Sequence, residues 1–156
     1  IVACLVGSEM CIRDREISDE ENLPKNIEMG PKTDFGWEVY PPGIYDLLMK
    51  LKKEYCVEAI FITENGCSYS DAPNEENKIK DQRRIDYHHT HLIEIQKAIN
   101  DGVDCKGYFA WSLMDNFEWA QGFSQRFGLV WVDFESLDRI PKESYHWYKN
   151  YISNNK

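Results

Sequence analysis

The chain has 156 residues, of which 42% are hydrophobic and 13% aromatic. That length is typical of one globular domain, and the aromatic content argues against a disordered chain. Acidic residues number 27 and basic residues 18, and the net charge of -9 repels nucleic-acid phosphates and anionic membranes. These values argue against two independent domains and against a general nucleic-acid binder.

The cysteines and the hydropathy pattern indicate in which cellular compartment the protein is expected. The cysteines are scattered, odd in number and without metal-ligand spacing, so they predict free thiols in a reducing compartment: Cys4, Cys11, Cys56, Cys67 and Cys105. No run approaches the roughly 20 apolar residues of a membrane span, and residues 1–7 lack the basic start and the length of a signal peptide. We therefore expect a cytoplasmic protein with no membrane partner.

Residues 1–30 show no helical or strand period and are expected to form an irregular segment, whereas residues 31–156 are expected to fold. The run from Cys4 to Arg15 resembles a translated sequencing-adaptor contaminant that recurs at the ends of assembled gene fragments. Part of the N-terminal segment is therefore expected to be artefactual.

From residue 41 the sequence alternates between helical and strand patterns. Pro41-Pro42-Gly43 opens a helix whose apolar residues recur at helical spacing: Ile44, Leu47, Leu48, Leu51 and Tyr55. Residues 59–63 are short, uncharged and rich in β-formers, which predicts a strand buried on both faces. Residues 68–82 are polar and predict a long surface loop.

The same alternation continues to the end of the chain. A helix is expected over residues 83–100, with one apolar face made by Ile85, Leu92, Ile95 and Ile99. A strand is expected over residues 106–111, and a closing helix over residues 142–152 carries Tyr145, Tyr148 and Ile152. This rhythm is typical of parallel βα units, but two buried strands cannot close a sheet, so the pattern indicates part of a larger α/β fold.

Two segments carry candidate functional side chains. Glu64 and the turn Asn65-Gly66 follow the first buried strand, where α/β barrels place catalytic groups, although Glu64 could equally be a polar residue that starts a loop. Trp111 and Trp119 flank a carboxylate after the second strand, a combination that suits sugar recognition. A buried aromatic cluster is the alternative there, and it is the commoner role of tryptophan.

Together these segments resemble the C-terminal part of a family 1 glycoside hydrolase, the β-glucosidase family. The similarity runs from about residue 31 to residue 152 and is carried by T-E-N-G at 63–66, GYFAWSL at 107–113, DNFEW at 115–119 and RFGLV at 126–130. Residues 34–43 and 84–92 also match. Several long motifs in the family's order make chance agreement negligible.

The resemblance implies a (β/α)8 TIM barrel that hydrolyses β-glycosides with retention, through two carboxylates about 5 to 5.5 Å apart. Glu64 matches the family's nucleophile, which attacks the anomeric carbon and must be ionised while its partner is protonated. The resemblance also implies a cis peptide between Trp111 and Ser112.

The same matching implies a set of sugar-binding residues. Glu118 accepts hydrogen bonds from O4 and O6 of the non-reducing sugar, and Trp119 donates one to O3. Trp111 forms the platform beneath that sugar, Phe127 walls the pocket, and Trp37 lies nearer the aglycone.

The chain departs from the family because the acid/base motif T-x-N-E-P and the early sugar-binding Gln and His are absent. A complete barrel takes roughly 250 residues. We therefore expect an incomplete barrel, a C-terminal portion holding the last two strands and three helices, and inactive by itself.

Two rival functions stay open. A phospho-β-glycosidase of this family replaces the Glu-Trp pair with small residues, whereas Glu118 and Trp119 are present here and a carboxylate repels a 6-phosphate. A β-glucoside or cello-oligosaccharide substrate is therefore favoured. A non-catalytic carbohydrate-binding remnant that uses Trp111 and Trp119 is the second rival.

The remaining candidates predict no metal and no cofactor. His88, His89 and His91 cluster, but no cysteine or carboxylate completes a ligand set, so a solvated helix surface is expected. Cys67 has no basic neighbour in the sequence to make it a thiolate, which favours an incidental role.

Overall fold

The computed structural model describes residues 2–6 and 30–154. In chain order its elements are β1 Val2–Val6, α2 Pro42–Tyr55, β2 Ala59–Asn65, α3 Gln82–Asn100, β3 Cys105–Ala110, the 3₁₀ turn η1 Trp119–Gln121, β4 Val130–Val132, β5 Arg139–Pro141 and α4 Glu143–Asn154. The expected helices and the two expected strands are confirmed to within a few residues. The short antiparallel pair of β4 and β5 has no clear sequence signal.

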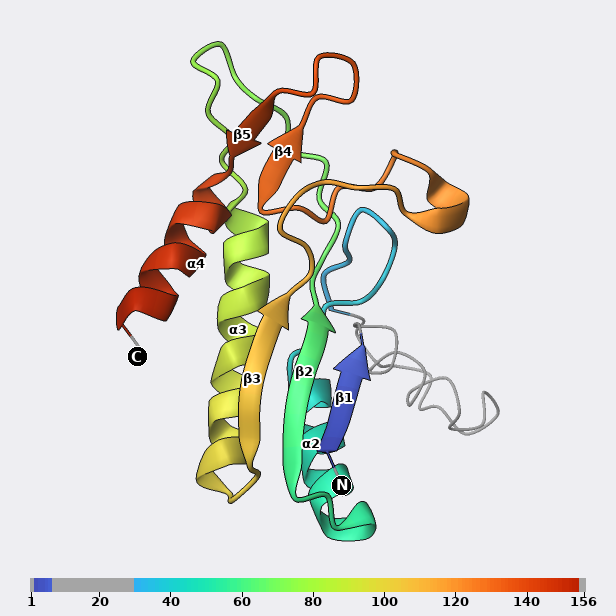
Figure 1. The fold of residues 1–156 in the computed structure, drawn as a ribbon, viewed down its shortest axis with the longest axis vertical. Coiled ribbons are helices and arrows are strands. Elements are labelled where there is room, and N and C mark those ends of the chain that lie inside the picture. The colour runs from blue at the N-terminus through green and yellow to red at the C-terminus, as the bar shows by residue number, and fades with distance from the viewer. Residues whose placement is uncertain (1, 7–29, 155–156) are drawn as a thin grey trace.

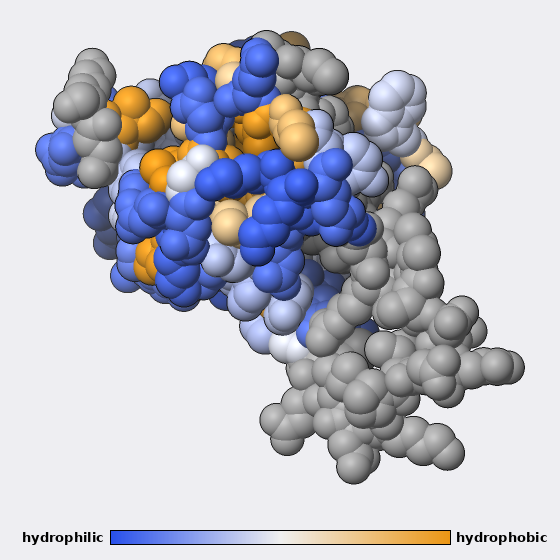
Figure 2. Space-filling view, turned by 90° about the horizontal axis from the view of Figure 1, so that it is seen from below, coloured by the Kyte–Doolittle hydropathy of each residue, from blue (hydrophilic) through white to orange (hydrophobic). Residues whose placement is uncertain are grey.

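Three strands form one parallel sheet in the order β1-β2-β3. Figure 1 shows their carboxyl ends at the same end of the molecule, where the long loops and the β4–β5 pair gather. Figure 2 views the opposite end, where β2 and β3 begin, and that end is largely hydrophilic with smaller hydrophobic areas. The strand order confirms parallel α/β pairing of β2 with β3 and places the candidate residues at one end.

The helices cover one face of this sheet. Ile44 and Leu48 of α2, together with Leu92 and Ile95 of α3, pack on the buried strand residues Ile60 and Ile62. Pro42 begins α2 at a position where a missing N–H costs nothing. Burying such aliphatic side chains contributes about 1.5 to 3 kcal/mol each, and this core fixes the register between strands and helices.

The expectation that residues 59–63 are buried on both faces is wrong. Only alternate residues, Ile60 and Ile62, are buried, while Phe61 and Thr63 are half-buried. The face opposite the helices has no covering element in the described part of the chain. Three residues expected on apolar helix faces are also exposed: Tyr55 is 61%, Ile99 37% and Ile152 46% exposed.

The N-terminal segment is not irregular throughout. Val2–Val6 forms β1 and pairs in parallel with one edge of β2. Five apolar residues are too few to show a period, and it is the backbone groups offered by the β2 edge that select the extended conformation. The segment expected to be artefactual, apart from these residues, lies outside the described residues.

The loop between β2 and α3 is irregular as expected but only partly on the surface. Ser68, Tyr69, Ile79 and Asp81 are buried within it. The loop is therefore held against the body of the protein, and its buried polar groups need partners.

The expectation of a solvated histidine cluster is wrong. His88 and His91 are buried on the inner face of α3, and only His89 is exposed. Burial lowers the pKa of His88 from 6.5 to about 3 and that of His91 from 6.5 to about 4. Both rings are therefore neutral in the folded protein, because charging them inside the core requires desolvation of the cation.

These depressed pKa values predict acid lability. Below pH 6.5 the two histidines are protonated in the unfolded chain but stay neutral in the folded protein. The free energy of unfolding therefore decreases as the pH falls toward 4. The expected slope is about 1.4 kcal/mol per pH unit for each histidine. Urea unfolding between pH 4.5 and 7 measures it. His91→Asn should reduce the slope and the exposed control His89→Gln should not; equal slopes in both variants would contradict the assignment.

Candidate active site

Glu64 lies at the carboxyl end of β2, next to an extra residue in that strand. Between Ile62 and Asn65, β2 advances three residues while its partner β3 advances two, from Tyr108 to Ala110. The pairing with β1 shifts at the same place. A β-bulge of this kind re-aims side chains and is frequent beside active sites.

The bulge reverses the alternation of inward and outward residues. Ile60, Ile62 and Asn65 are buried against the helices, so the interval changes from two residues to three. Without the bulge Glu64 would continue the row of Ile60 and Ile62 into the core. With it, Glu64 is half-buried and shares the face of Phe61, away from α2 and α3.

Trp111 is held against the turn that follows Glu64. Its backbone N–H donates a 2.8 Å hydrogen bond to the Asn65 carbonyl. A Cβ atom on Gly66 would lie 1.7 Å from the Trp111 carbonyl oxygen, so only glycine permits this approach. The Trp111–Ser112 peptide is cis, as the family resemblance predicted. The ends of β2 and β3 are thus fixed to each other beside Glu64.

Phe127 and Trp37 meet in an aromatic cluster near the same strand ends. The Ser112 N–H donates to the Phe127 carbonyl at 3.1 Å, which places buried Phe127 next to the end of β3. The rings of Trp37 and Phe127 lie 5.9 Å apart, and Phe35 packs on Trp37 at 4.3 Å. The structure therefore brings together three of the predicted residues: Trp111, Phe127 and Trp37.

Glu118 and Trp119 lie farther out on the loop after β3. The Glu118 N–H donates to the Gly122 carbonyl, which closes a tight turn around η1. Trp119 is 83% exposed and Glu118 is half-buried. In the described part of the chain, Trp119 is the least covered of the predicted sugar-binding residues.

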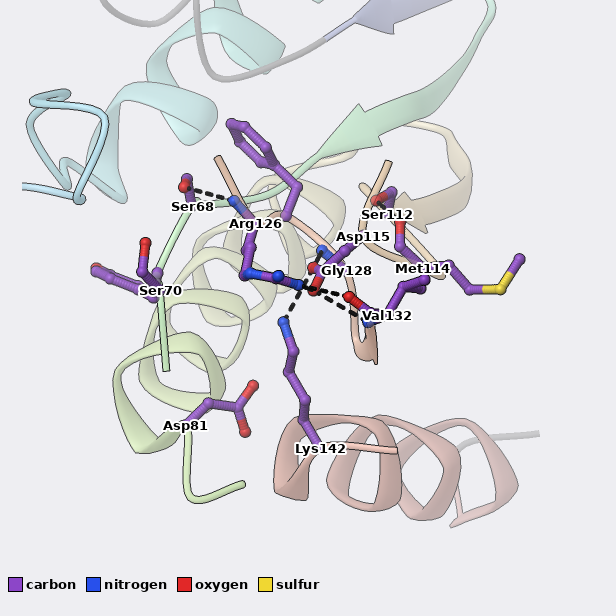
Figure 3. A network of polar contacts seen from close by, with 12 residues as sticks. Ser68, Ser70, Asp81, Ser112, Met114, Asp115, Arg126, Gly128, Val132 and Lys142 are labelled. Carbon is purple, nitrogen blue, oxygen red and sulfur yellow. Dashed lines mark hydrogen bonds and ion pairs between the residues drawn. The ribbon is translucent and has the colours of Figure 1, made fainter. Parts of the chain in front are cut away.

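The loop after β3 is anchored at its start by the buried carboxylate of Asp115. Asp115 accepts from Arg126 at 2.6 Å and from Lys142 at 3.1 Å, one cation on each oxygen (Figure 3). It also accepts the Gly128 N–H at 2.9 Å. Burial lowers the pKa of Lys142 to about 8, an effect that the Asp115 charge opposes. The anchor fixes the loop bearing Glu118 to the segment bearing Phe127.

Arg84 connects the loop after Glu64 to the same segment. Its guanidinium is completely buried and uses all five N–H donors. One goes to Asp81 at 2.9 Å, and the other four go to backbone carbonyls of the two loops: Cys67, Tyr69, Arg126 and Phe127. Asp81 in turn accepts from the Ser144 backbone and hydroxyl, which ties α4 to the network.

Sequence reasoning missed Arg84, Asp81, Asp115 and Lys142. Asp81 precedes a helix and Arg84 opens a family-like segment, but charged residues are usually exposed and no local pattern marks a buried one. Arg84 lies next to Cys67 in the fold, but it donates to the Cys67 backbone carbonyl. Burial still raises the pKa of the Cys67 thiol to about 12, which keeps it protonated.

Among residues 2–6 and 30–154 there is no group of three His, Cys, Asp or Glu side chains arranged to hold a metal ion. Within the same residues no helix is both long and apolar enough to cross a bilayer.

A parallel sheet with helices packed on one face, and with Glu64 at the carboxyl end of its middle strand, makes this an α/β protein. The chain belongs to glycosyl hydrolase family 1, whose family model matches residues 8–156. The resemblance seen in the sequence is thereby confirmed.

Several relatives are similar over most of this chain. It is 52% identical over 125 residues to a 1,4-β-D-glucan glucohydrolase of Thermotoga neapolitana, and 51% identical over 125 residues to β-glucosidase A of Thermotoga maritima. It is also 50% identical over 121 residues to a 6-phospho-β-galactosidase of Staphylococcus haemolyticus. The first two matches cover 80% of this chain and 28% of the relative, so the chain spans under a third of their length.

A solved structure agrees with these relatives. The family 1 β-glucosidase of Thermotoga maritima in complex with isofagomine lactam matches with a TM-score of 0.81 and 49% identity. The match covers 83% of this chain and 30% of that one. The parallel arrangement described above is therefore shared with a family 1 structure over most of this chain.

The buried guanidinium predicts a large difference between two neighbouring arginines. Arg84→Met leaves Asp81 without its buried counter-charge and takes one donor from each of four carbonyls, of which Arg126 and Phe127 keep a backbone N–H donor. The change should cost about 3 to 5 kcal/mol of unfolding free energy. Arg83 forms exposed ion pairs with Asp34 and Asp71, so Arg83→Met should cost at most about 1 kcal/mol. Urea titration of both variants checks this, and similar losses would contradict the role given to Arg84.

Proposed function

We propose that this chain is the C-terminal part of a retaining β-glucosidase built as a (β/α)8 barrel. The observation that carries the proposal is the bulge that turns Glu64 away from the core beside Trp111, whose N–H bonds to Asn65 at 2.8 Å. The backbone of Trp111 is thereby fixed to the turn that follows Glu64, at the carboxyl end of a parallel sheet. The family membership and the β-glucosidase relatives support the same reading.

In the proposed reaction, Glu64 acts as the nucleophile and forms a glycosyl-enzyme that water then hydrolyses. Trp111 lies beneath the sugar, and Glu118 and Trp119 bind its hydroxyls. Phe127 and Trp37 wall the pocket, with Trp37 nearer the aglycone; their 5.9 Å ring separation supports one continuous aromatic wall. No metal or cofactor is part of this scheme.

The general acid is proposed to lie on a part of the barrel outside this chain. The sequence has no T-x-N-E-P motif, and the matched relatives are more than three times as long as the matched segment. A glycosidase needs both carboxylates, because one must protonate the leaving oxygen while the other attacks. The cytoplasmic location expected from the cysteines remains a prediction of the sequence alone.

Unphosphorylated glucosides are the proposed substrates, although one relative at 50% identity is a 6-phospho-β-galactosidase. The argument is the pair Glu118-Trp119, because a carboxylate near O6 repels a phosphate there. Cello-oligosaccharides and aryl β-glucosides fit a pocket with an aromatic wall. Comparing kcat/KM for an aryl β-glucoside and its 6-phosphate in the full-length protein tests the choice, and a preference for the phosphate would reverse it.

Substitution of Glu64 tests the proposed role directly. In the full-length protein, Glu64→Gln should lower kcat by several orders of magnitude, because the glycosyl-enzyme cannot form. Glu64→Ala with added azide should release a glycosyl azide of inverted configuration, which NMR identifies. Glu58→Gln, at the residue that precedes the opposite end of β2, is the matched control and should keep full activity. Wild-type turnover by Glu64→Gln would remove Glu64 from the role.

The chain by itself should be inactive toward an aryl β-glucoside. Loss of general-acid assistance alone costs about 10²- to 10⁴-fold, and part of the proposed pocket is also missing. The assay compares purified residues 1–156 with the full-length protein at equal concentration. Turnover by the isolated chain that disappears in its Glu64→Gln variant would show that the second carboxylate lies within it.

The rival reading, a non-catalytic carbohydrate-binding remnant, makes a different prediction for the isolated chain. It should then bind cello-oligosaccharides with measurable affinity through Trp111 and Trp119. Calorimetric titration against Trp119→Ala distinguishes the two. The exposed position of Trp119 supports the enzyme reading, because a binding ring needs partners that hold the sugar on its other sides.

A further inference from the structure

A chain of hydrogen bonds lies directly behind the residue that follows Glu64. The Tyr108 hydroxyl donates to Asn65 Oδ1 at 2.8 Å, and Asn65 Nδ2 donates to the Tyr87 hydroxyl at 3.3 Å. His88 Nδ1 lies 2.8 Å from the same Tyr108 hydroxyl. The chain thus joins β2, β3 and α3 at the point where the bulge ends.

The direction of this hydrogen-bond chain follows from counting its protons. Tyr108 donates its only hydroxyl proton to Asn65, so its oxygen is the acceptor in the contact with His88. The donor in that contact is His88 Nδ1, which therefore carries the proton of the ring. The pKa of His88, lowered to about 3 by burial, leaves the ring with a single proton. His88 Nε2 is buried without a hydrogen-bond partner among the described residues, as the unprotonated nitrogen of that tautomer would be.

Asn65 is the residue through which this chain reaches the site. It restores the register with β3 after the bulge, and its carbonyl accepts the Trp111 N–H. Its side chain is buried on the helix side of the sheet, whereas Glu64, one residue earlier, faces the other way. The hydrogen bonds of the buried amide to Tyr87 and Tyr108 fix the side chain of Asn65 in place, and this restrains the Asn65 backbone and the peptide that joins it to Glu64.

We propose that Asn65 is a positioning residue for the nucleophile Glu64, and that the directed chain from His88 through Tyr108 orients its amide. The inference rests on the function proposed above. None of the three residues touches the substrate in this scheme, so each acts through the backbone at the end of β2. The reactive carboxylate needs such control, because attack on the anomeric carbon requires a near-attack geometry.

This role predicts a defect in the rate of attack and not in sugar binding. A displacement of about 1 Å costs on the order of a hundredfold in rate, whereas binding contacts on the other side of the pocket are unchanged. The step is isolated with 2,4-dinitrophenyl 2-deoxy-2-fluoro-β-glucoside, in which Glu64 displaces dinitrophenolate and stays bonded to the sugar. That leaving group departs as an anion without protonation, so the general acid does not mask the effect.

The experiment compares two single hydroxyl deletions in the full-length protein. Tyr108→Phe removes the donor to Asn65, and the matched control Tyr148→Phe removes a hydroxyl that donates to the Tyr108 carbonyl in the same aromatic cluster. We expect Tyr108→Phe to lower the inactivation rate constant about tenfold or more, with an unchanged dissociation constant for the inhibitor. Tyr148→Phe should react at the wild-type rate.

The number of labelled sites separates positioning from simple loss of folded protein. A structural defect lowers the fraction of Glu64 that is labelled, whereas a positioning defect leaves full labelling and slows it. Peptide mass spectrometry counts the labelled fraction. Equal rate constants in Tyr108→Phe and wild type, or equal slowing in both variants, would overturn the inference, while failure to label Glu64 in the wild type would instead overturn the proposed function.

A second pair of variants tests the chain should Tyr108→Phe yield no labelled protein. His88→Leu removes the donor to Tyr108, and His88→Asn restores an N–H near the position of Nδ1. We expect His88→Leu to slow inactivation several-fold and His88→Asn to recover most of the rate. If His88→Leu reacts at the wild-type rate, or if both variants are slowed equally, the directed chain is wrong.

Discussion

The site depends on one buried cation. The Arg84 guanidinium leaves water completely, which is tolerable only because Asp81 supplies a counter-charge and four backbone carbonyls use the remaining donors. Those carbonyls belong to the loop after Glu64 and to the segment bearing Phe127. Two irregular stretches far apart in sequence are therefore held in one arrangement without regular secondary structure. A hydrophobic side chain could fill the same volume but could not satisfy the carbonyls.

A second constraint acts at the end of β2. The apolar core requires Ile60 and Ile62 to face the helices, and strict alternation would then send Glu64 into that core. The extra residue resolves the conflict, since it returns Asn65 to the helix side and leaves Glu64 on the other. Gly66 is the further requirement, because the Trp111 backbone occupies the space of a Cβ atom. Core packing and site geometry are thus compatible only through a local irregularity.

The sequence predicted the helices and strands better than it predicted the contacts that hold them together. The helices and β2 and β3 follow from apolar periodicity, and Glu64 and Trp111 follow from motifs at strand ends. Buried charges such as Arg84 and Asp115 were missed, because their burial depends on partners 11 to 43 residues away, which no local period reveals. His88 was placed on the surface for the same reason, since its hydroxyl partner lies on β3. β1 was missed because its extended conformation depends on pairing with β2, which is distant in the sequence.

The two faces of the sheet differ in how they are covered. The helix face is closed by aliphatic packing and by the hydrogen bonds of Asn65, whereas the opposite face presents Glu64 beside Phe61 and a 57% exposed Phe109. Within the described residues Glu64 forms no ion pair with a basic side chain. In the proposed barrel these rings are covered, and a charged carboxylate among covered apolar rings needs donors to offset its desolvation.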